Sequence, residues 1–174
     1  MYGYGGMGHY DIHTEVIMRE QWLRFFSKEQ MIRVQEVIRA NGMDGLYSEF
    51  GLLFIEPSAE ASAEPIVDEA TRKMTAAFRR SESTPWGFGG VHSCICGAAS
   101  EAHDYFLPGG WITNSLCIHY LAYHRDAVPE TELQKVMHLG SGMRFPRPRE
   151  LKRASPQEFK NRAIDAIRSL EHFG

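Results

Sequence analysis

Side chains that bind metals are concentrated in one short part of this 174-residue chain. The segment "GVHSCICGAASEAHDYFLPGGWITNSLCIHYLAYHR", residues 90–125, contains all 3 cysteines and half of the 8 histidines. Thiolates and imidazoles are ligands that zinc prefers. In a reducing compartment, cysteines clustered with histidines indicate metal binding or redox chemistry rather than a disulfide framework.

The first part of this segment, "HSCICG", offers donor side chains at alternate positions. Residues two apart share a face of an extended chain, so we predict that His92, Cys94 and Cys96 point the same way. Gly97 can adopt a positive φ and let the chain turn tightly behind the thiols. We therefore expect a knuckle that presents two thiolates to a neighbouring element.

The second part of the segment supplies that neighbouring element. "HDYFLPGGWIT" has the pattern of a strand, a Pro-Gly-Gly turn and a returning strand. Thr113 is then predicted to be the N-cap of a helix over "NSLCIHYLAYHR", which carries Cys117, His119 and His124. A β-hairpin followed by a helix would bring imidazoles to the thiolates.

A tetrahedral zinc site takes four ligands from elements that pack together, and the predicted set is Cys94, Cys96, His119 and His124. The histidine spacing falls within the H-x₃₋₅-H range of structural zinc sites, whereas the cysteine spacing is shorter than C-x₂₋₄-C. Five positions on an ideal helix separate the two imidazoles by roughly 140°. The helix must therefore tighten or fray near His124, or another residue must replace it. The reserve ligands are His92, His103 and Cys117.

Packing alone explains some of these residues. Cys117 lies between Leu116 and Ile118, and a free cysteine often fills a hydrophobic core. His119 can likewise be a core histidine with a satisfied ring. A redox-active pair is the other interpretation of the C-x-C motif. An iron–sulfur cluster is disfavoured, because three cysteines would need a histidine as the fourth ligand.

This segment resembles a set of bacterial proteins of unknown function. They share an H-x-C-x-C-G knuckle, a Leu-Pro-x-Gly turn, the run T-N-S-L-x-x-H-Y and a following H-R-x-x-V-P. In this chain the four motifs are residues 92–97, 107–110, 113–120 and 124–129. The resemblance implies that the block is a transferable unit, as expected of a metal-held module. It implies no activity.

Length and composition indicate a single globular domain. The chain is 43% hydrophobic and 24% charged, as in ordinary globular proteins. It contains neither an apolar run of about 18 residues nor the layout of a signal peptide. We therefore expect a cytoplasmic protein that makes no contact with a membrane.

The net charge of −3 is unevenly distributed. Residues 1–140 hold 11 lysines and arginines against 18 acidic residues, whereas residues 141–174 hold 8 against 4. A basic segment attracts phosphates or an acidic partner, or else it lies on the acidic body of its own chain. Most of the excess is in "SGMRFPRPRELKRAS", where the basic residues are Arg144, Arg147, Arg149, Lys152 and Arg153.

The expected fold is α+β and mainly helical, with helices packed around a small zinc-held β-hairpin–helix module. Ser27 and Gln30 form the capping box of a helix that is predicted to end at Asn41–Gly42. Pro65 is expected in the first turn of the next helix. The predicted order is a flexible arm (1–10), a helical region (11–80) with an exposed loop (56–64), the Cys/His zinc module and following helix (86–139), a basic linker (140–154) and a C-terminal helix (155–173), all in one compact domain.

The sequence favours a small zinc finger-like protein with a structural Cys₂His₂-type site that acts as an interaction or adaptor protein. Its expected partner is a protein, and nucleic acid bound by the basic segment is the weaker alternative. A zinc-dependent hydrolase with three ligands is another possibility, with Glu101, Asp104 or His124 as the base. A thiol-redox or metal-handling protein is the third. No H-E-x-x-H, zinc-deaminase, G-x-S-x-G or Walker motif occurs, so no enzyme class is indicated.

Overall fold

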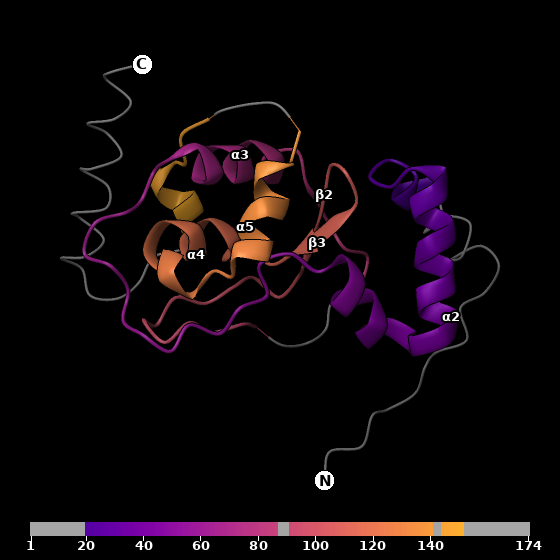
Figure 1. Cartoon of the computed structure of the whole chain (residues 1–174), viewed down its shortest axis with the longest axis horizontal. Coiled ribbons are helices and arrows are strands. Elements are labelled where there is room, and N and C mark those ends of the chain that lie inside the picture. The colour runs from indigo at the N-terminus through magenta and orange to yellow at the C-terminus, as the bar shows by residue number, and fades with distance from the viewer. Residues whose placement is uncertain (1–19, 87–90, 141–143, 152–174) are drawn as a thin grey trace, which may run out of the picture.

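The computed structural model describes residues 20–86, 91–140 and 144–151. In this part of the chain the fold is α+β, with a small three-stranded antiparallel sheet. The long helix α2 (Lys28–Phe50) lies at one end of the molecule, and α3 (Glu69–Phe78), α4 (Cys117–Tyr123) and α5 (Glu130–Met137) pack together toward the other end (Figure 1). The predicted arm (1–10) and C-terminal helix (155–173) lie outside the described residues.

Helix α2 begins as predicted and continues beyond its predicted end. The Ser27 side chain accepts a hydrogen bond from the Gln30 backbone N–H, and the Gln30 side chain accepts one from the Ser27 N–H, which completes the capping box. Gly42 has a φ of 70° and a ψ of −160°, so the helix bends there. It then resumes, because Leu46 and Phe50 are buried on its inner face. The predicted terminus is therefore a kink.

Helix α3 begins later than Pro65, and the prediction was wrong here. Its N-cap is Asp68, whose side chain accepts a hydrogen bond from the Thr71 N–H. The chain just before it is held by α4 instead, because the Ile66 N–H donates to the Ala122 carbonyl. Within α3 the expected apolar stripe is buried at Ala70, Met74 and Ala77.

The sheet is short and contains the predicted hairpin. Strands β2 (Tyr105–Leu107) and β3 (Trp111–Thr113) pair antiparallel, with Phe106 opposite Ile112. Both glycines of the turn have positive φ, 99° at Gly109 and 91° at Gly110, as the Pro-Gly-Gly motif predicts. Strand β1 (Glu82–Ser83) pairs with the free edge of β2.

Helix α4 is buried along its whole length, since every one of its seven residues is buried. It packs against α3 and against the 3₁₀ turn η2 (Pro148–Leu151). The 3₁₀ turn η1 (Arg125–Ala127) then leads to α5. Because Thr113 belongs to β3 and α4 starts at Cys117, Thr113 is not the N-cap that the sequence predicted. A separate core cluster is formed by aromatic residues that precede α2, among them Trp22 and Phe26, together with apolar residues of α2 and Phe106 and Ile112 of the sheet.

The loop 56–64 is largely exposed, but its backbone is hydrogen-bonded to the end of α4. The Ser62 N–H donates to the Tyr123 carbonyl at 2.8 Å. This bond satisfies one of the carbonyls that a helix leaves free at its C-terminus. In the part of the chain that the structure describes, no helix has the length and apolar character needed to cross a bilayer.

Candidate metal centre

The knuckle is a tight hairpin over residues 92–100. The Cys94 N–H donates to the Ala98 carbonyl at 2.7 Å, and the Gly97 N–H donates back to the Cys94 carbonyl at 2.9 Å. Gly97 has a φ of 88°, the positive value predicted for it. The turn places both thiols on the side that faces α4.

The knuckle corrects one prediction. The chain turns at Ile95 and Cys96 instead of running straight, so the strict alternation of an extended strand does not hold. His92 therefore does not join the two cysteines. Its Nε2 lies 3.9 Å from Oδ1 of Asp104, and its side chain is half exposed.

The helix side of the site is built from His119 in α4 and His124 just after it. Helix α4 ends at Tyr123, and His124 has a φ of −129° and a ψ of 37°, outside the helical range. This is the fraying that the five-residue spacing requires, because an intact helix would hold the two rings on different faces. The ring centroids of His119 and His124 are consequently only 5.1 Å apart.

The four predicted ligands lie together. Sγ of Cys94 is 3.1 Å from Nε2 of His124, and Sγ of Cys96 is 3.2 Å from Nε2 of His119. All four donor atoms are within 4.8 Å of one another. Bond lengths of about 2.3 Å to sulfur and 2.0–2.1 Å to nitrogen give a tetrahedron with edges of about 3.3–3.8 Å. The cluster can therefore hold a metal ion after small shifts of the four side chains.

Burial makes the cluster unfavourable for uncompensated charge. His119 is 0% exposed, His124 4% and Cys94 5%, while Cys96 is half-buried. Burial raises the pKa of Cys96 to about 11, and the neighbouring Cys94 acts in the same direction. Burial also lowers the pKa of His124. Two thiolates beside two neutral imidazoles need a positive charge between them, which a divalent cation would supply.

The loop 56–64 contributes an outer contact that sequence reasoning missed. The His124 side chain makes a hydrogen bond with the backbone of Ala59, and this bond opposes the effect of burial on the His124 pKa. Metal-binding histidines usually use their second ring nitrogen in this way, which fixes the orientation of the ring. No side chain in the sequence could have signalled the contact, because the partner is the backbone of an alanine.

The reserve ligands lie outside the cluster. Cys117 is fully buried in the core that α4 forms with α3 and α5, as the packing interpretation predicted. His103 is exposed. Neither belongs to a group of potential metal ligands among the described residues.

Glu101 and Asp104, the two acidic residues considered as general bases, both accept hydrogen bonds from tyrosines. The Tyr105 hydroxyl donates to the Glu101 carboxylate. The Tyr47 hydroxyl donates to Oδ2 of Asp104 at 2.8 Å and accepts from Nε1 of Trp86 at 2.9 Å. This Trp86–Tyr47–Asp104 network joins α2 to the start of β2 and was not predicted.

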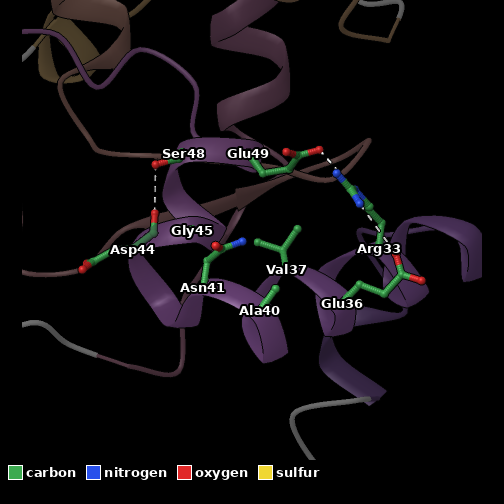
Figure 2. A pocket seen from close by; sticks show the side chains of 9 residues that line it. All are labelled: Arg33, Glu36, Val37, Ala40, Asn41, Asp44, Gly45, Ser48 and Glu49. Atoms are coloured by element: carbon green, nitrogen blue, oxygen red, sulfur yellow. Dashed lines mark hydrogen bonds and ion pairs between the residues drawn. The ribbon is translucent and has the colours of Figure 1, made fainter.

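A hollow lies inside the bend of α2 (Figure 2). Among its lining residues, Arg33 forms ion pairs with Glu36 and Glu49, and the Ser48 hydroxyl donates to the Asp44 backbone carbonyl. The floor contains Val37, Ala40 and Gly45. We assign no ligand to this hollow, because the Arg33 guanidinium is already paired with Glu36 and Glu49.

No protein family matches the chain, and neither a curated protein nor a solved structure matches it significantly. The Cys/His cluster is therefore the feature of the chain that points to a function.

Proposed function

We propose that this chain is a small zinc-binding protein in which a structural Cys₂His₂ site holds an interaction surface in place. The observation that carries the proposal is the approach of two Sγ and two Nε2 atoms to within 4.8 Å. Two sulfur and two nitrogen ligands suit tetrahedral zinc, and a site with four protein ligands leaves no position for a catalytic water. This favours a structural role over hydrolysis.

Zinc has a clear structural task here. The strands of the sheet contain only two or three residues each, and the knuckle has a single bridge between Ser93 and Ala99. Isolated hairpins of this size are marginally stable. A metal held jointly by the knuckle and by the end of α4 would fasten the two elements, and its binding free energy would become folding free energy.

The surface of the knuckle supports the interaction role. Val91 and Ile95 are 56% and 58% exposed although they are large and apolar, and Ile95 lies between the two cysteines. Val91, Ser93 and Ile95 all face solvent, whereas Cys94 faces the cluster. We infer that the metal fixes these side chains for contact with a partner protein. Free cysteines fit a reducing compartment such as the cytoplasm.

The alternatives receive less support from the site. A redox-active cysteine needs an accessible thiolate with a lowered pKa, whereas the pKa of Cys96 is raised. A hydrolase needs an open metal position and a base beside it. Asp104 and Glu101 are instead hydrogen-bonded to tyrosines.

The test is metal analysis of protein purified without added metal, combined with thermal unfolding. We expect one zinc per chain, and we expect Cys94→Ser and Cys96→Ser to lose it and to melt earlier. The effect should be large, because apparent zinc affinities of about 10–16 kcal/mol compare with a whole-domain stability of about 5–15 kcal/mol.

Cys117→Ala is the matched control, because it removes a buried thiol that lies outside the cluster. It should keep the zinc and reduce the stability by about 1 kcal/mol, from loss of a small buried group. Unchanged metal content and melting temperature in both Cys94→Ser and Cys96→Ser would contradict the proposal. A metal-free protein with a reversible disulfide would indicate the redox alternative, and a zinc with an exchangeable water ligand would indicate an enzyme.

A further inference from the structure

The described part of the predicted basic linker, residues 144–151, forms a strap that is anchored to α3. Arg79 Nε lies 2.7 Å from Oε1 of Glu150, and Arg79 Nη2 lies 2.9 Å from Oε2 of the same carboxylate. The same Nη2 donates to the Phe145 carbonyl at 3.0 Å. Leu151 is buried in the core against α4. The backbone of the strap is therefore fixed at both of its ends.

A second arginine of α3 adds charge to the strap. The Arg72 guanidinium carbon lies 4.1 Å from the centroid of the Phe145 ring. Arg72 Nε is buried and has no hydrogen-bond partner among the described residues. A buried guanidinium nitrogen without an acceptor is unusual, because such groups are normally paired. The Arg72 side chain as a whole is partly exposed, so its guanidinium adds positive charge to this face.

The remaining charges of the strap point outward. Arg144, Arg147 and Arg149 are exposed, whereas Pro146 and Leu151 are buried. In the described ranges none of these three arginines forms an ion pair. The acidic residue of the strap, Glu150, is already engaged by Arg79. The strap thus holds three guanidinium groups on a fixed backbone, and none of them is paired with an acidic side chain in the part of the chain that the structure describes.

We propose that Arg72, Arg144, Arg147 and Arg149 form the docking face for a carboxylate-rich segment of a partner protein. The inference rests on the proposed interaction function, but it uses residues outside the metal cluster. Guanidinium groups bind carboxylates through two parallel hydrogen bonds, and a fixed backbone reduces the entropy lost on binding. Charge complementarity of this kind also accelerates encounter with the partner.

A carboxylate-rich segment fits this face better than a nucleic acid does. Residues 1–140 contain 11 lysines and arginines against 18 acidic residues, so this larger part of the molecule repels a long polyanion. Binding of single strands usually adds stacking on aromatic rings. Phe145, the aromatic residue of the strap, is half-buried and has the Arg72 guanidinium over its ring. A short acidic segment needs neither a long positive track nor an exposed ring.

The experiment measures binding of a fluorescent deca-glutamate peptide to the full chain by anisotropy, with a uridine decanucleotide as the competing class of ligand. The test variant is Arg144→Gln/Arg147→Gln/Arg149→Gln. Arg24→Gln/Lys28→Gln/Arg39→Gln is the control, because it removes the same number of exposed positive charges from the region of α2. We expect the test variant to bind the peptide about tenfold more weakly, with a reduced salt dependence, and the control to bind like the wild type.

Three results would overturn the proposal: no binding of the peptide by the wild type, equal weakening in the control, or preferential binding of the decanucleotide. Melting temperatures of both variants are measured to verify that they are folded. Zinc content, measured on the same samples, separates this proposal from the previous one. Arginine-dependent peptide binding by a zinc-free protein would leave the docking face intact and contradict only the structural zinc site.

Discussion

Asp104 is a carboxylate that the fold places in a confined position. Burial raises its pKa, while the hydrogen bond from Tyr47 and the nearby His92 and His103 act against burial. A carboxyl group with a raised pKa in the folded state binds its proton more tightly there than in the unfolded chain. Its contribution to stability is therefore largest at acid pH, and it falls as the pH rises above the unfolded value of about 4 toward the folded value.

Asp104→Asn should consequently become more stable relative to the wild type as the pH rises from about 4 to about 7. The asparagine keeps an oxygen that can accept from the Tyr47 hydroxyl, but it carries no charge to desolvate. Urea unfolding of both proteins at the two pH values measures the change, and the comparison at each pH cancels any shared loss of metal. Asp126→Asn, at an exposed position, controls for the loss of one negative charge. If Asp104→Asn instead gained stability relative to the wild type as the pH falls, burial would not be the main influence on the pKa of Asp104.

The candidate ligands could be predicted from the sequence because their residue types carry the chemistry. Cys94, Cys96, His119 and His124 follow from donor type and from spacing alone, and so does the requirement that the helix fray at His124. The position of His92 could not be predicted, because it depends on where the knuckle turns. Contacts made by the backbone, such as that of Ala59 with His124, could not be predicted either, because they do not depend on the type of side chain.

The bend of α2 is held by one glycine. A φ of 70° with a ψ of −160° at Gly42 belongs to a region that residues with a Cβ avoid. The bend allows the second half of the helix to bury Leu46 and Phe50 and to bring Tyr47 to Asp104. An Asn-Gly pair predicts a helix end from local chemistry. Burial of the following residues is a tertiary effect, and it explains why the helix resumes.

Gly42→Ala should therefore destabilise the protein by about 1–3 kcal/mol, the usual cost of holding such a residue in a glycine conformation. Chemical denaturation monitored by circular dichroism measures this. Arg39→Ala, on an exposed position of the same helix, is the control and should stay within about 0.5 kcal/mol. Greater helicity together with unchanged or higher stability in Gly42→Ala would mean that α2 can run straight and that the bend is not required.

At the scale of the whole molecule, the strap formed by residues 144–151 packs back onto α3 and connects distant parts of the chain. From its sequence alone, the basic segment can either lie on the body of its own chain or face outward. In the structure the strap does both, because its residues alternate between the two sides within a short stretch. Three arginines face solvent, namely Arg144, Arg147 and Arg149. The residues that pack inward are Phe145, Pro146, Glu150 and Leu151. The proline-rich pattern predicted an extended strap, but the ion pair with Arg79 and the turn at residues 148–151 depend on α3, which is distant in sequence.

Glu150→Gln tests the attachment of the strap to α3 directly. The side chains of Arg79 and Glu150 are only 18% and 11% exposed, so the substitution leaves a guanidinium without its carboxylate in a largely desolvated position. Loss of one partner of a fully buried pair costs about 3–5 kcal/mol, and we expect about 1–3 kcal/mol here because both side chains retain some contact with water.

The salt dependence of Glu150→Gln distinguishes a buried brace from a surface pair. An exposed pair is screened as the Debye length falls from about 10 Å at 0.1 M salt to about 3 Å at 1 M, whereas a buried pair is screened far less. The difference in unfolding free energy between Glu150→Gln and the wild type should therefore persist at 1 M salt. Glu60→Gln, on the exposed loop 56–64, should match the wild type at both salt concentrations.

Proteolytic cleavage should also increase within residues 144–151 of Glu150→Gln, because detachment from α3 exposes the strap backbone. If the destabilisation disappears in high salt and cleavage does not increase, the strap is held by its apolar residues and the ion pair adds little.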